Sequence, residues 1–548
     1  MFVRAQRSGK RTYLLVVENE WAAGKVRQKV LHRLGRLDIL QKTGKLDALM
    51  LSMQRFSEKF AVLGASESVQ ARTGRSCSIG PALIFERLWR QTGIDKVLSG
   101  LLGKRKFTFS VERAVFLTVL HRLFCSGSDR AAAKWKANYR IKGVEDIELH
   151  QIYRAMGWLG QPLGADEQFG ATPFAPRCTK DVIEEQLFKS RRDLFAGLDL
   201  VFFDTTSIYF EGAGGETIGK NGHSKDHRPD LKQMVVGMIL DEQGNPLCSE
   251  MWPGNVTDVK TLVPVVDRLK TRFGVGNVCI VADRGMISKE TIREIEKRGW
   301  KYVLGVRMRK SKEVRDKVFS QGGRYQQVFG KSKDSKAPSP LKVKEVAIGP
   351  KRYIVCLNED QAAKDRADRE AIVGSLREAL KRGDKSLIGN KGYRRFVASR
   401  GQRFVIDEQK VRQDARYDGK WVLTTNTNFS AKAAALKYKQ LWMVESIFRS
   451  MKSLLETRPI FHKCDATIRG HVFCSFLALL LRKELENRLE QKGLTIEWAD
   501  VIRELDDLIE MEITVSDKHY TIRSDTAGTV AKVFSACGVA LPPMLSQC

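Results

Sequence analysis

The segments LDLVFFDTT (residues 198–206) and VCIVADRG (residues 278–285) decide the fold of this chain. Both are apolar for most of their length, which is typical of central strands that are covered on both faces of a sheet. Each apolar run ends at an aspartate, Asp204 in the first and Asp283 in the second. Because a strand end holds a side chain rigidly, we expect the two carboxylates to share one site if the strands are neighbours.

The sequence that follows Asp204 predicts an α/β layer with a mixed sheet. Three strands come first, and a helix, a strand, a second helix and a further strand follow. This order is similar to that of an RNase H-like catalytic core, whose first part we expect over residues 196–310. The elements expected after the first strand are strands at residues 234–240 and 246–252, a helix at 259–273, a strand at 278–282, a helix at 290–298 and a strand at 302–306.

A basic and irregular stretch, residues 311–415, interrupts this core, and residues 416–505 complete it. Strand-like pieces within the stretch indicate a β-rich basic insertion that splits the catalytic core. The elements expected here are strands at residues 353–357 and 404–406 and a helix at 365–381 in the insertion, followed by a strand at 421–425 and a long helix at 431–456.

The long helix supplies a candidate third carboxylate, Glu445. Its apolar residues recur at helical spacing and predict a buried stripe, and an adjacent polar face carries Tyr438, Glu445, Arg449 and Lys452. Taken alone, Glu445 and Arg449 fit a solvated i,i+4 ion pair. Together with two strand-end aspartates, Glu445 fits a third metal ligand. The stripe consists of Leu441, Val444, Phe448, Met451 and Leu455.

The N-terminal residues 1–42 form a separate basic module in this interpretation. They hold ten Lys and Arg against three acidic residues. Strand-like sequence at residues 12–17 and 26–31 flanks a turn at 21–24, which predicts a β-hairpin. A solvated basic tail is the alternative, but the β-branched strands favour a small folded module that contacts DNA.

Residues 43–195 predict a mainly helical domain. Apolar residues recur there at helical spacing, and many Arg and Lys residues accompany them, so the domain is a candidate for DNA binding. A stretch near residues 160–180 is rich in Gly, Pro and Ala and lacks periodicity, and we interpret it as a linker. Residues 506–548 form a C-terminal segment whose sequence predicts little.

The net charge of the chain indicates the class of its binding partner. The 548-residue chain contains 94 Lys and Arg against 64 Asp and Glu, a formal net charge of +30, which indicates a polyanionic partner such as nucleic acid. The sequence lacks an apolar run of about 18–20 residues, so we expect no membrane span. Its glycine-rich stretches match neither a P-loop nor a dinucleotide fingerprint, so we expect no nucleotide cofactor.

Three carboxylates on a basic chain predict two-metal phosphoryl transfer. In-line attack on a phosphodiester requires charge neutralisation at the attacking and the leaving oxygen, and two divalent cations with hard oxygen ligands provide it. We therefore expect Asp204, Asp283 and Glu445 to be the catalytic residues and to hold two Mg²⁺ ions, for which Mn²⁺ could substitute.

Three motifs resemble the DDE transposases of bacterial insertion sequences. Tyr438, Glu445 and Lys452 match the branch motif Y-x2-R-x3-E-x6-K, and Leu441 stands where that motif has Arg. Residues 222–233 resemble the loop G-x-S-K-D-x-R-P-D-L-x-Q of the same branch, and PGNVTD at residues 253–258 is similar to another of its motifs. The resemblance is strongest over residues 196–480.

The resemblance implies a DNA transposase that binds terminal inverted repeats, cleaves DNA at the element ends and joins the 3′ ends to target DNA. It implies double-stranded DNA as the partner and a homodimer in the active complex. The N-terminus lacks an apolar signal segment, so we expect a cytoplasmic bacterial protein that is nucleoid-associated when bound to DNA. The expected DNA contacts are Lys225, Arg228, Arg284, Tyr438, Arg449 and Lys452.

Two alternatives remain open at this point. One is an RNase H-like nuclease that hydrolyses DNA without strand transfer, and the other is a non-catalytic DNA-binding repressor derived from a transposase. Inverted repeats flanking the gene would favour transposition over both. If a proposed carboxylate proves dispensable, the substitutes to test are Asp226, Asp230, Asp258 and Glu456.

Overall fold

The computed structural model divides the chain into two compact units. The first comprises Met1–Gly80, Asn138–Arg140 and Trp498–Cys548, and the second comprises Pro81–Ala137 and Ile141–Glu497. The predicted domain boundaries differ from this division and stay predictions. The structure describes residues 2–9, 11–22, 25–54, 71–103, 105–169, 171–172, 175–191, 200–275, 278–330, 338–383, 391–400, 403–515, 518–526 and 528–547.

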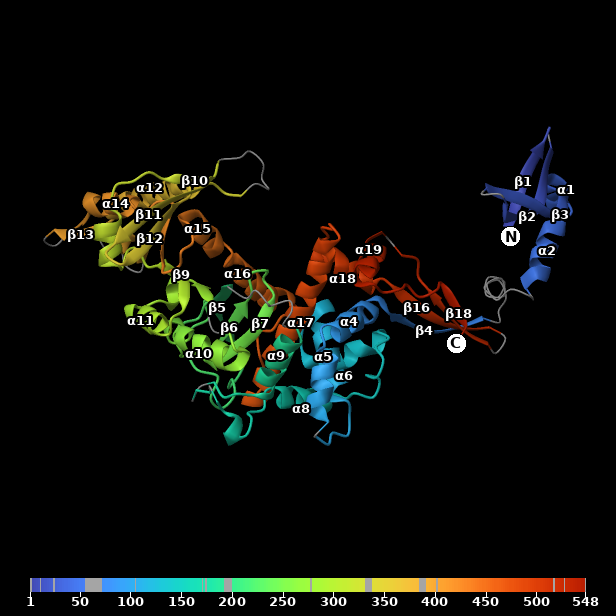
Figure 1. Ribbon diagram of the computed structural model, residues 1–548, viewed down its shortest axis with the longest axis horizontal. Helices are drawn as coiled ribbons and strands as arrows, with labels where there is room; N and C mark the ends of the chain where they lie inside the picture. Colours follow the sequence, from blue (N-terminus) through green and yellow to red (C-terminus); the bar gives the residue numbers. More distant parts are fainter. Residues whose placement is uncertain are drawn as a thin grey trace. The chain divides into compact units, whose positions relative to one another are not determined.

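The second unit is built on a nine-stranded mixed sheet with the strand order β10-β11-β12-β15-β9-β8-β5-β6-β7 (Figure 1). Strands β5, β8 and β9 are parallel to one another, and the other neighbouring pairs are antiparallel. The fold class is therefore mixed α/β. The strands are β5 (Leu200–Tyr209), β6 (Gln233–Leu240), β7 (Pro246–Pro253), β8 (Cys279–Ala282), β9 (Lys301–Val306), β10 (Gln326–Phe329), β11 (Leu341–Ile348), β12 (Lys351–Leu357) and β15 (Lys420–Thr425).

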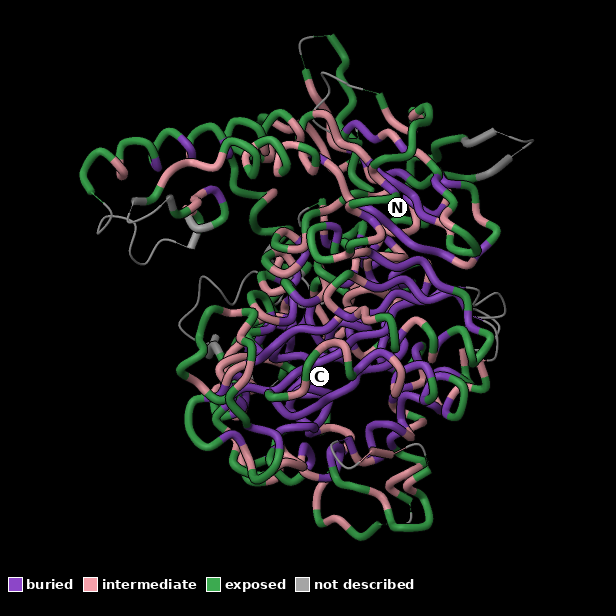
Figure 2. The backbone as a smooth tube through the Cα atoms, turned by 90° about the vertical axis from the view of Figure 1, so that its left-hand side faces the viewer, coloured by how far each residue is buried: buried purple, intermediate pink, exposed green. Residues whose placement is uncertain are grey.

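Helices cover both faces of this sheet. On one face, α9 (Thr179–Ser190), α10 (Leu262–Phe273) and α11 (Lys289–Lys297) close an apolar core over β5 to β9. On the other face, α15 (Ala431–Lys439) lies on β8, β9, β11 and β12, and α16 (Trp442–Arg449) lies on β5 and β6. Strands β6, β7 and β8 are buried along their whole length. Figure 2 shows buried backbone in the interior and exposed backbone mainly toward the outside.

The elements predicted between residues 200 and 306 agree with the structure in type and order. The first two residues of the first predicted strand, Leu198 and Asp199, lie outside the described residues. The strands and the long helix expected in residues 311–415 are also present, the helix as α12 (Glu359–Lys381). The strand predicted at residues 353–357 is β12, which together with β10 and β11 extends the main sheet beyond β15. The strand predicted at 404–406 instead pairs with residues Val397–Arg400 in a separate two-stranded sheet.

The single long helix predicted over residues 431–456 is wrong. Helix α15 ends at Lys439, α16 begins at Trp442, and a π-helical turn, Ser450–Leu454, follows. The break is a tight turn, since the amide of Leu441 donates to Tyr438 O at 3.1 Å and that of Met443 donates to Gln440 O at 2.9 Å. These bonds span three residues instead of the four of an α-helix.

A helical layer belongs to the same unit as the sheet. Its long helix α17 (Asp465–Gln491) packs on α6, α8 and β7. The contact between α17 and α8 is so close that a Cβ on Gly470 would lie 1.9 Å from Met156 O. Only glycine fits there. The remaining helices are α4 (Gly80–Gln91), α5 (Ile94–Leu102), α6 (Val111–Phe124), α7 (Asp129–Trp135) and α8 (Leu149–Leu159).

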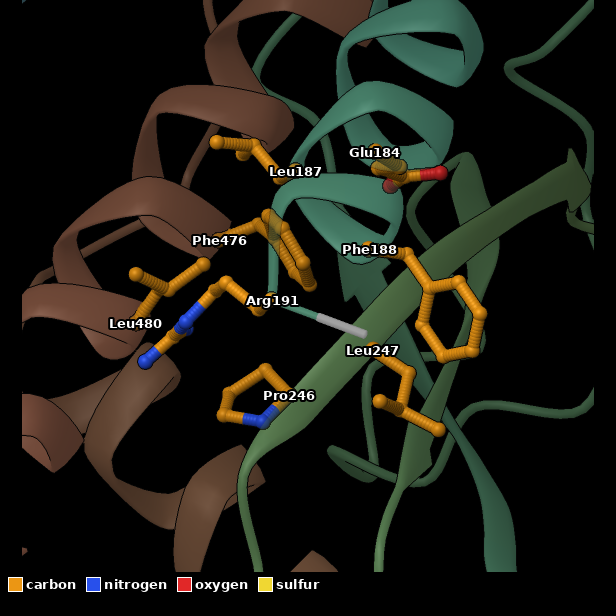
Figure 3. Close-up of a pocket in the computed structure, with 8 residues that line it drawn as sticks. All are labelled: Glu184, Leu187, Phe188, Arg191, Pro246, Leu247, Phe476 and Leu480. Atoms are coloured by element: carbon orange, nitrogen blue, oxygen red, sulfur yellow. The ribbon is translucent and has the colours of Figure 1, made fainter. Parts of the chain in front are cut away.

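Helix α9 connects this layer to the sheet, beside a small cavity lined by Leu187, Phe476 and Leu247 among others (Figure 3). Arg191, just after α9, forms an ion pair at 2.7 Å with Glu484 of α17. The predicted linker near residues 160–180 leads into α9. Its described part is hydrogen-bonded, for example from the amide of Arg177 to Gln168 Oε1 at 2.9 Å.

A buried ion network fixes α9 against β7 and α10. Arg272 is its centre, with nitrogen atoms 2.7–3.2 Å from Asp181, Glu184, Glu185 and Glu250. The side chain of Arg272 is 1% exposed, and the network balances four positive with four negative groups. Its members are Arg177, Lys180, Arg268 and Arg272 with Asp181, Glu184, Glu185 and Glu250.

The first unit contains two further sheets. A three-stranded antiparallel sheet is formed by β1 (Phe2–Ser8), β2 (Arg11–Ala22) and β3 (Lys25–Arg36). Residues 23 and 24 of the turn predicted between the last two strands lie outside the described residues. The second sheet pairs β4 (Ala71–Ser78) with the C-terminal strands β16 (Ile509–Val515), β17 (Lys518–Arg523) and β18 (Leu545–Gln547). Among the helices that the structure describes, we find none with the length and apolarity needed to cross a membrane.

We expect Arg272→Met to destabilise the second unit by about 3–5 kcal/mol, because it leaves buried carboxylates without their shared cation. Urea unfolding followed by tryptophan fluorescence measures the loss. Arg298→Met is the control: its pair with Asp267 at 2.6 Å is 31% exposed at the arginine, so its loss should cost about 0–1 kcal/mol. Equal losses in the two variants would contradict a special role for the buried network.

Candidate active site

Strand register brings the two predicted aspartates together. Phe203 of β5 pairs in parallel with Ala282 of β8, and Asp204 and Asp283 are the residues that follow. Phe203 and Ala282 belong to the core under α10. Because side chains alternate between the faces of a strand, Asp204 and Asp283 point to the opposite face, which α15 and α16 cover.

Helix α16 adds the third carboxylate on that face. Its predicted apolar stripe is buried, with Val444 at 0% and Phe448 at 5% exposure, so Glu445 lies on the open side of the helix. Asp204, Asp283 and Glu445 line one cavity of about 270 Å³. Its other lining residues are Trp421, Tyr438, Lys439, Leu441 and Trp442.

Asp204 is held by its own strand and by the loop before β6. The amide of Thr205 donates to Asp204 Oδ1 at 2.7 Å, and Lys225 Nζ donates to Thr205 O at 2.6 Å. Burial raises the pKa of Asp204 to about 6, against the opposing effect of the Lys225 ammonium, and the nearby Asp283 and Asp258 add to the rise. The Asp283 and Asp258 carboxylates beside Asp204 favour a bound cation.

A fourth carboxylate, Asp258, lies next to the site. Thr205 Oγ1 donates to Asp258 Oδ1 at 2.8 Å, and Lys225 Nζ lies 3.2 Å from Asp258 Oδ2. The sequence identified Asp258 only as a substitute. Asp258 is the last residue of the PGNVTD motif, which begins at the end of β7. This motif is the sequence signal that could have placed Asp258 among the main candidates.

Tyr438 contacts a carboxylate. Its hydroxyl donates to Asp283 Oδ1 at 2.8 Å, and burial raises the pKa of the phenol, with the Asp283 charge adding to the rise. Gly305 of β9 makes room for the ring, because a Cβ there would lie 2.4 Å from the tyrosine hydroxyl. Sequence reasoning missed Gly305, which has no motif of its own.

The other residues expected to contact DNA differ in how they are held. Arg228 forms an ion pair at 2.8 Å with Asp230, and Lys452 forms one at 2.7 Å with Asp226. Arg449 is exposed, and its side chain makes no ion pair or hydrogen bond with a residue that the structure describes. These three cations do not line the carboxylate cavity.

The donor set suits a hard divalent cation. Three carboxylates face one opening, and Mg²⁺ and Mn²⁺ prefer oxygen ligands of this type over sulfur or imidazole. Among the described residues that line the cavity there is no histidine or cysteine, the ligands most common in zinc sites. The residues present therefore fit the predicted metal.

A second group of possible ligands lies elsewhere, among Asp129, His462 and His471. Arg122 Nη2 lies 2.8 Å from His471 Nδ1 and 3.4 Å from Asp129 Oδ1, so a guanidinium already supplies the positive charge there. Burial lowers the pKa of His471 to about 4. We interpret the group as a hydrogen-bonded network around the Arg122–Asp129 ion pair. Sequence could not predict it, since 333 residues separate two of its members, Asp129 and His462.

Two transposase structures share weak overall similarity with the chain. The piggyBac transposase synaptic complex with hairpin DNA has 11% sequence identity and a TM-score of 0.35, covering 78% of this chain and 79% of that one. The Mos1 transposase paired-end complex with the left transposon end has 11% identity and a TM-score of 0.14, covering 36% and 60%. No curated protein matches the chain closely enough to count as a relative.

Family models match two parts of the sequence. The model of the IS1634 family transposase N-terminal domain matches residues 3–67. The model of the transposase DDE domain matches residues 196–481, a span that includes Asp204, Asp283 and Glu445. Since that second match covers more than half of the 548 residues, the chain belongs to the DDE transposases of bacterial insertion sequences.

Proposed function

We propose that this protein is a Mg²⁺-dependent transposase that binds the terminal inverted repeats of its element, cleaves the DNA at the element ends and joins the 3′ ends to target DNA. The observation that carries the proposal is that Asp204, Asp283 and Glu445 line one cavity. The net charge of +30 supports a DNA substrate. Two Mg²⁺ ions, when bound, would activate the attacking oxygen and stabilise the leaving oxygen.

Each residue of the site has a role in this proposal. Asp204, in the middle of β5, and Asp283, directly after β8, would hold the ions, and Glu445 would close the site from α16. Tyr438 orients the Asp283 carboxylate through its 2.8 Å hydrogen bond. Lys225 lies between Asp258 and the backbone of Thr205, where its charge offsets the carboxylates before DNA and metal bind.

The architecture proposed for this function is an RNase H-like core. The order of β5 to β9 with their helices supports it, as does the position of Glu445 on a helix across the sheet. The basic N-terminal module, residues 1–42, would contact DNA. The active complex would be a homodimer, because two element ends must be brought together before their joint transfer.

We expect Asp204→Asn, Asp283→Asn and Glu445→Gln each to lower the rate of Mg²⁺-dependent cleavage of an end duplex by roughly 10³-fold or more, since each change removes a metal ligand worth several kcal/mol in the transition state. DNA binding without metal should be retained. Asp267→Asn, an exposed change on α10, is the control. A variant that still cleaves at the wild-type rate would exclude its residue from the site.

Binding of the end duplex should depend strongly on salt. If six to ten phosphate contacts form, affinity falls by ~10³–10⁵ between 50 and 200 mM salt. Fluorescence anisotropy over that range measures it. A flat response would contradict DNA as the partner of the basic surface.

Leu441 stands where the family motif has arginine, and Arg449 is the candidate replacement, because its side chain is exposed and lacks a partner among the described residues. Lys452 already pairs with Asp226. We therefore expect Arg449→Ala to impair cleavage at least as much as Lys452→Ala, by about tenfold or more, a cost of ~1.4 kcal/mol. Strand cleavage on a pre-bound end duplex measures both, and full activity of the Arg449→Ala protein would rule out compensation.

A further inference from the structure

A second cavity, of about 280 Å³, borders the carboxylate site at Asp283. Two loops line it, one directly after β8 and one directly after β9. These strands are parallel neighbours in the sheet, so their carboxyl ends present both loops at the same edge. The lining residues are Asp283, Arg284, Gly285, Arg307, Met308, Arg309 and Lys310.

Positive charge dominates this second cavity. Four of its residues are cations and one, Asp283, is an anion. Arg307 donates to the main-chain oxygens of Arg284 at 3.0 Å and Gly285 at 2.7 Å. These acceptors are neutral, so they fix the guanidinium without offsetting its charge.

Of the other three cations in the cavity, one has an ion-pair partner and two have none among the described residues. Arg309 forms an ion pair with Asp414 at 3.1 Å, and its guanidinium lies over the ring of Tyr417. The side chains of Arg284 and Lys310 are exposed and make no hydrogen bond or ion pair with a described residue. Three positive charges beside the site therefore lack a carboxylate partner in the described parts of the chain.

The lining suits a phosphodiester better than a nucleotide base. Met308 is the one apolar side chain of the cavity, so the described residues offer no aromatic platform and no enclosed base pocket. Arginine and lysine bind phosphate oxygens without reading sequence. Because Asp283 lines both cavities, a phosphodiester chain that enters here and continues past Asp283 reaches the carboxylate cavity.

We propose that the cavity formed by Arg284, Arg307 and Lys310 binds the phosphodiester backbone of the DNA segment that continues past Asp283, an inference that rests on the proposed transposase function. Two DNA segments share this chemistry: the donor DNA that flanks the element end, and the target DNA that the freed 3′ end attacks. The experiment separates them.

Two variants remove the charge. Arg284→Gln/Lys310→Gln removes the two unpartnered cations, and Arg307→Gln removes the cation that is fixed to the main chain. The control is Lys270→Gln/Lys297→Gln, which lowers the net charge by the same two units at exposed positions of α10 and α11. Thermal unfolding curves that match the wild type establish that the double variants are folded.

Binding is measured in EDTA on two substrates. One is an uncleaved end duplex with flanking DNA, and the other is a random-sequence target duplex added to a complex with a pre-cleaved end. On one of them, the slope of log affinity against log salt should become shallower by about 1.8 in the Arg284→Gln/Lys310→Gln protein, about 0.9 for each lost phosphate contact. The substrate that shows the change identifies the DNA segment. Arg307→Gln should change the slope by about half as much on that substrate.

Activity in Mg²⁺ gives a second readout. If the cavity holds flanking DNA, cleavage of the end falls by tenfold or more, and if it holds target DNA, strand transfer from the pre-cleaved end falls while cleavage is unchanged. Slopes on both substrates equal to those of the control would overturn the proposal. Since binding is measured without catalysis, that result leaves the transposase function standing, whereas a wild-type protein that neither cleaves nor joins DNA contradicts the function itself.

Discussion

The candidate site depends on the parallel pairing of β5 with β8. That register sets Phe203 beside Ala282, and the residues after them, Asp204 and Asp283, then share one face of the sheet. A slip of one residue would turn one aspartate toward the apolar core under α10. The buried apolar runs on both strands make such a slip costly, so the packing of the core also fixes the position of the carboxylates.

Much of the sheet could be predicted because its signals are local. The apolar runs of β5 and β8, the turn between β6 and β7 and the amphipathic pattern of α10 each lie within a dozen or so residues. The same holds for the candidate site: apolar runs that stop at an aspartate and a helical stripe identified Asp204, Asp283 and Glu445, and the three line one cavity. The expectation that Asp204 ends its strand is wrong, because β5 continues to Tyr209.

The features that sequence missed depend on contacts between distant residues or on backbone geometry. Strand β12 joins the main sheet through β15, for example with Ile354 opposite Leu423, and no local pattern encodes that pairing. The break before α16 leaves the apolar spacing intact, so periodicity alone could not detect it. The pair between Lys452 and Asp226 spans 226 residues, so no local pattern could indicate it, and the DNA contact of Lys452 stays a prediction.

The net charge of the chain does not show which of its cations contact a ligand. The positive charges of Arg272 and its neighbours are balanced inside the protein by an equal number of carboxylates. The candidates for DNA contact in the second unit are the cations without such partners, and these include Arg284, Lys310 and Arg449. Their position beside the carboxylates, more than their number, connects the basic composition to the proposed chemistry.

The continuity of the sheet across β15 has a consequence for the chain's solubility. Strand β12 covers β15 along Lys420–Thr425, including the apolar residues Val422 and Leu423. If residues 311–415 were absent, β15 would become an open sheet edge with unpaired amides and carbonyls, which is a template for pairing with other chains. The segment that looks like an insertion in the sequence therefore covers a strand edge of the core, a role that is independent of DNA binding.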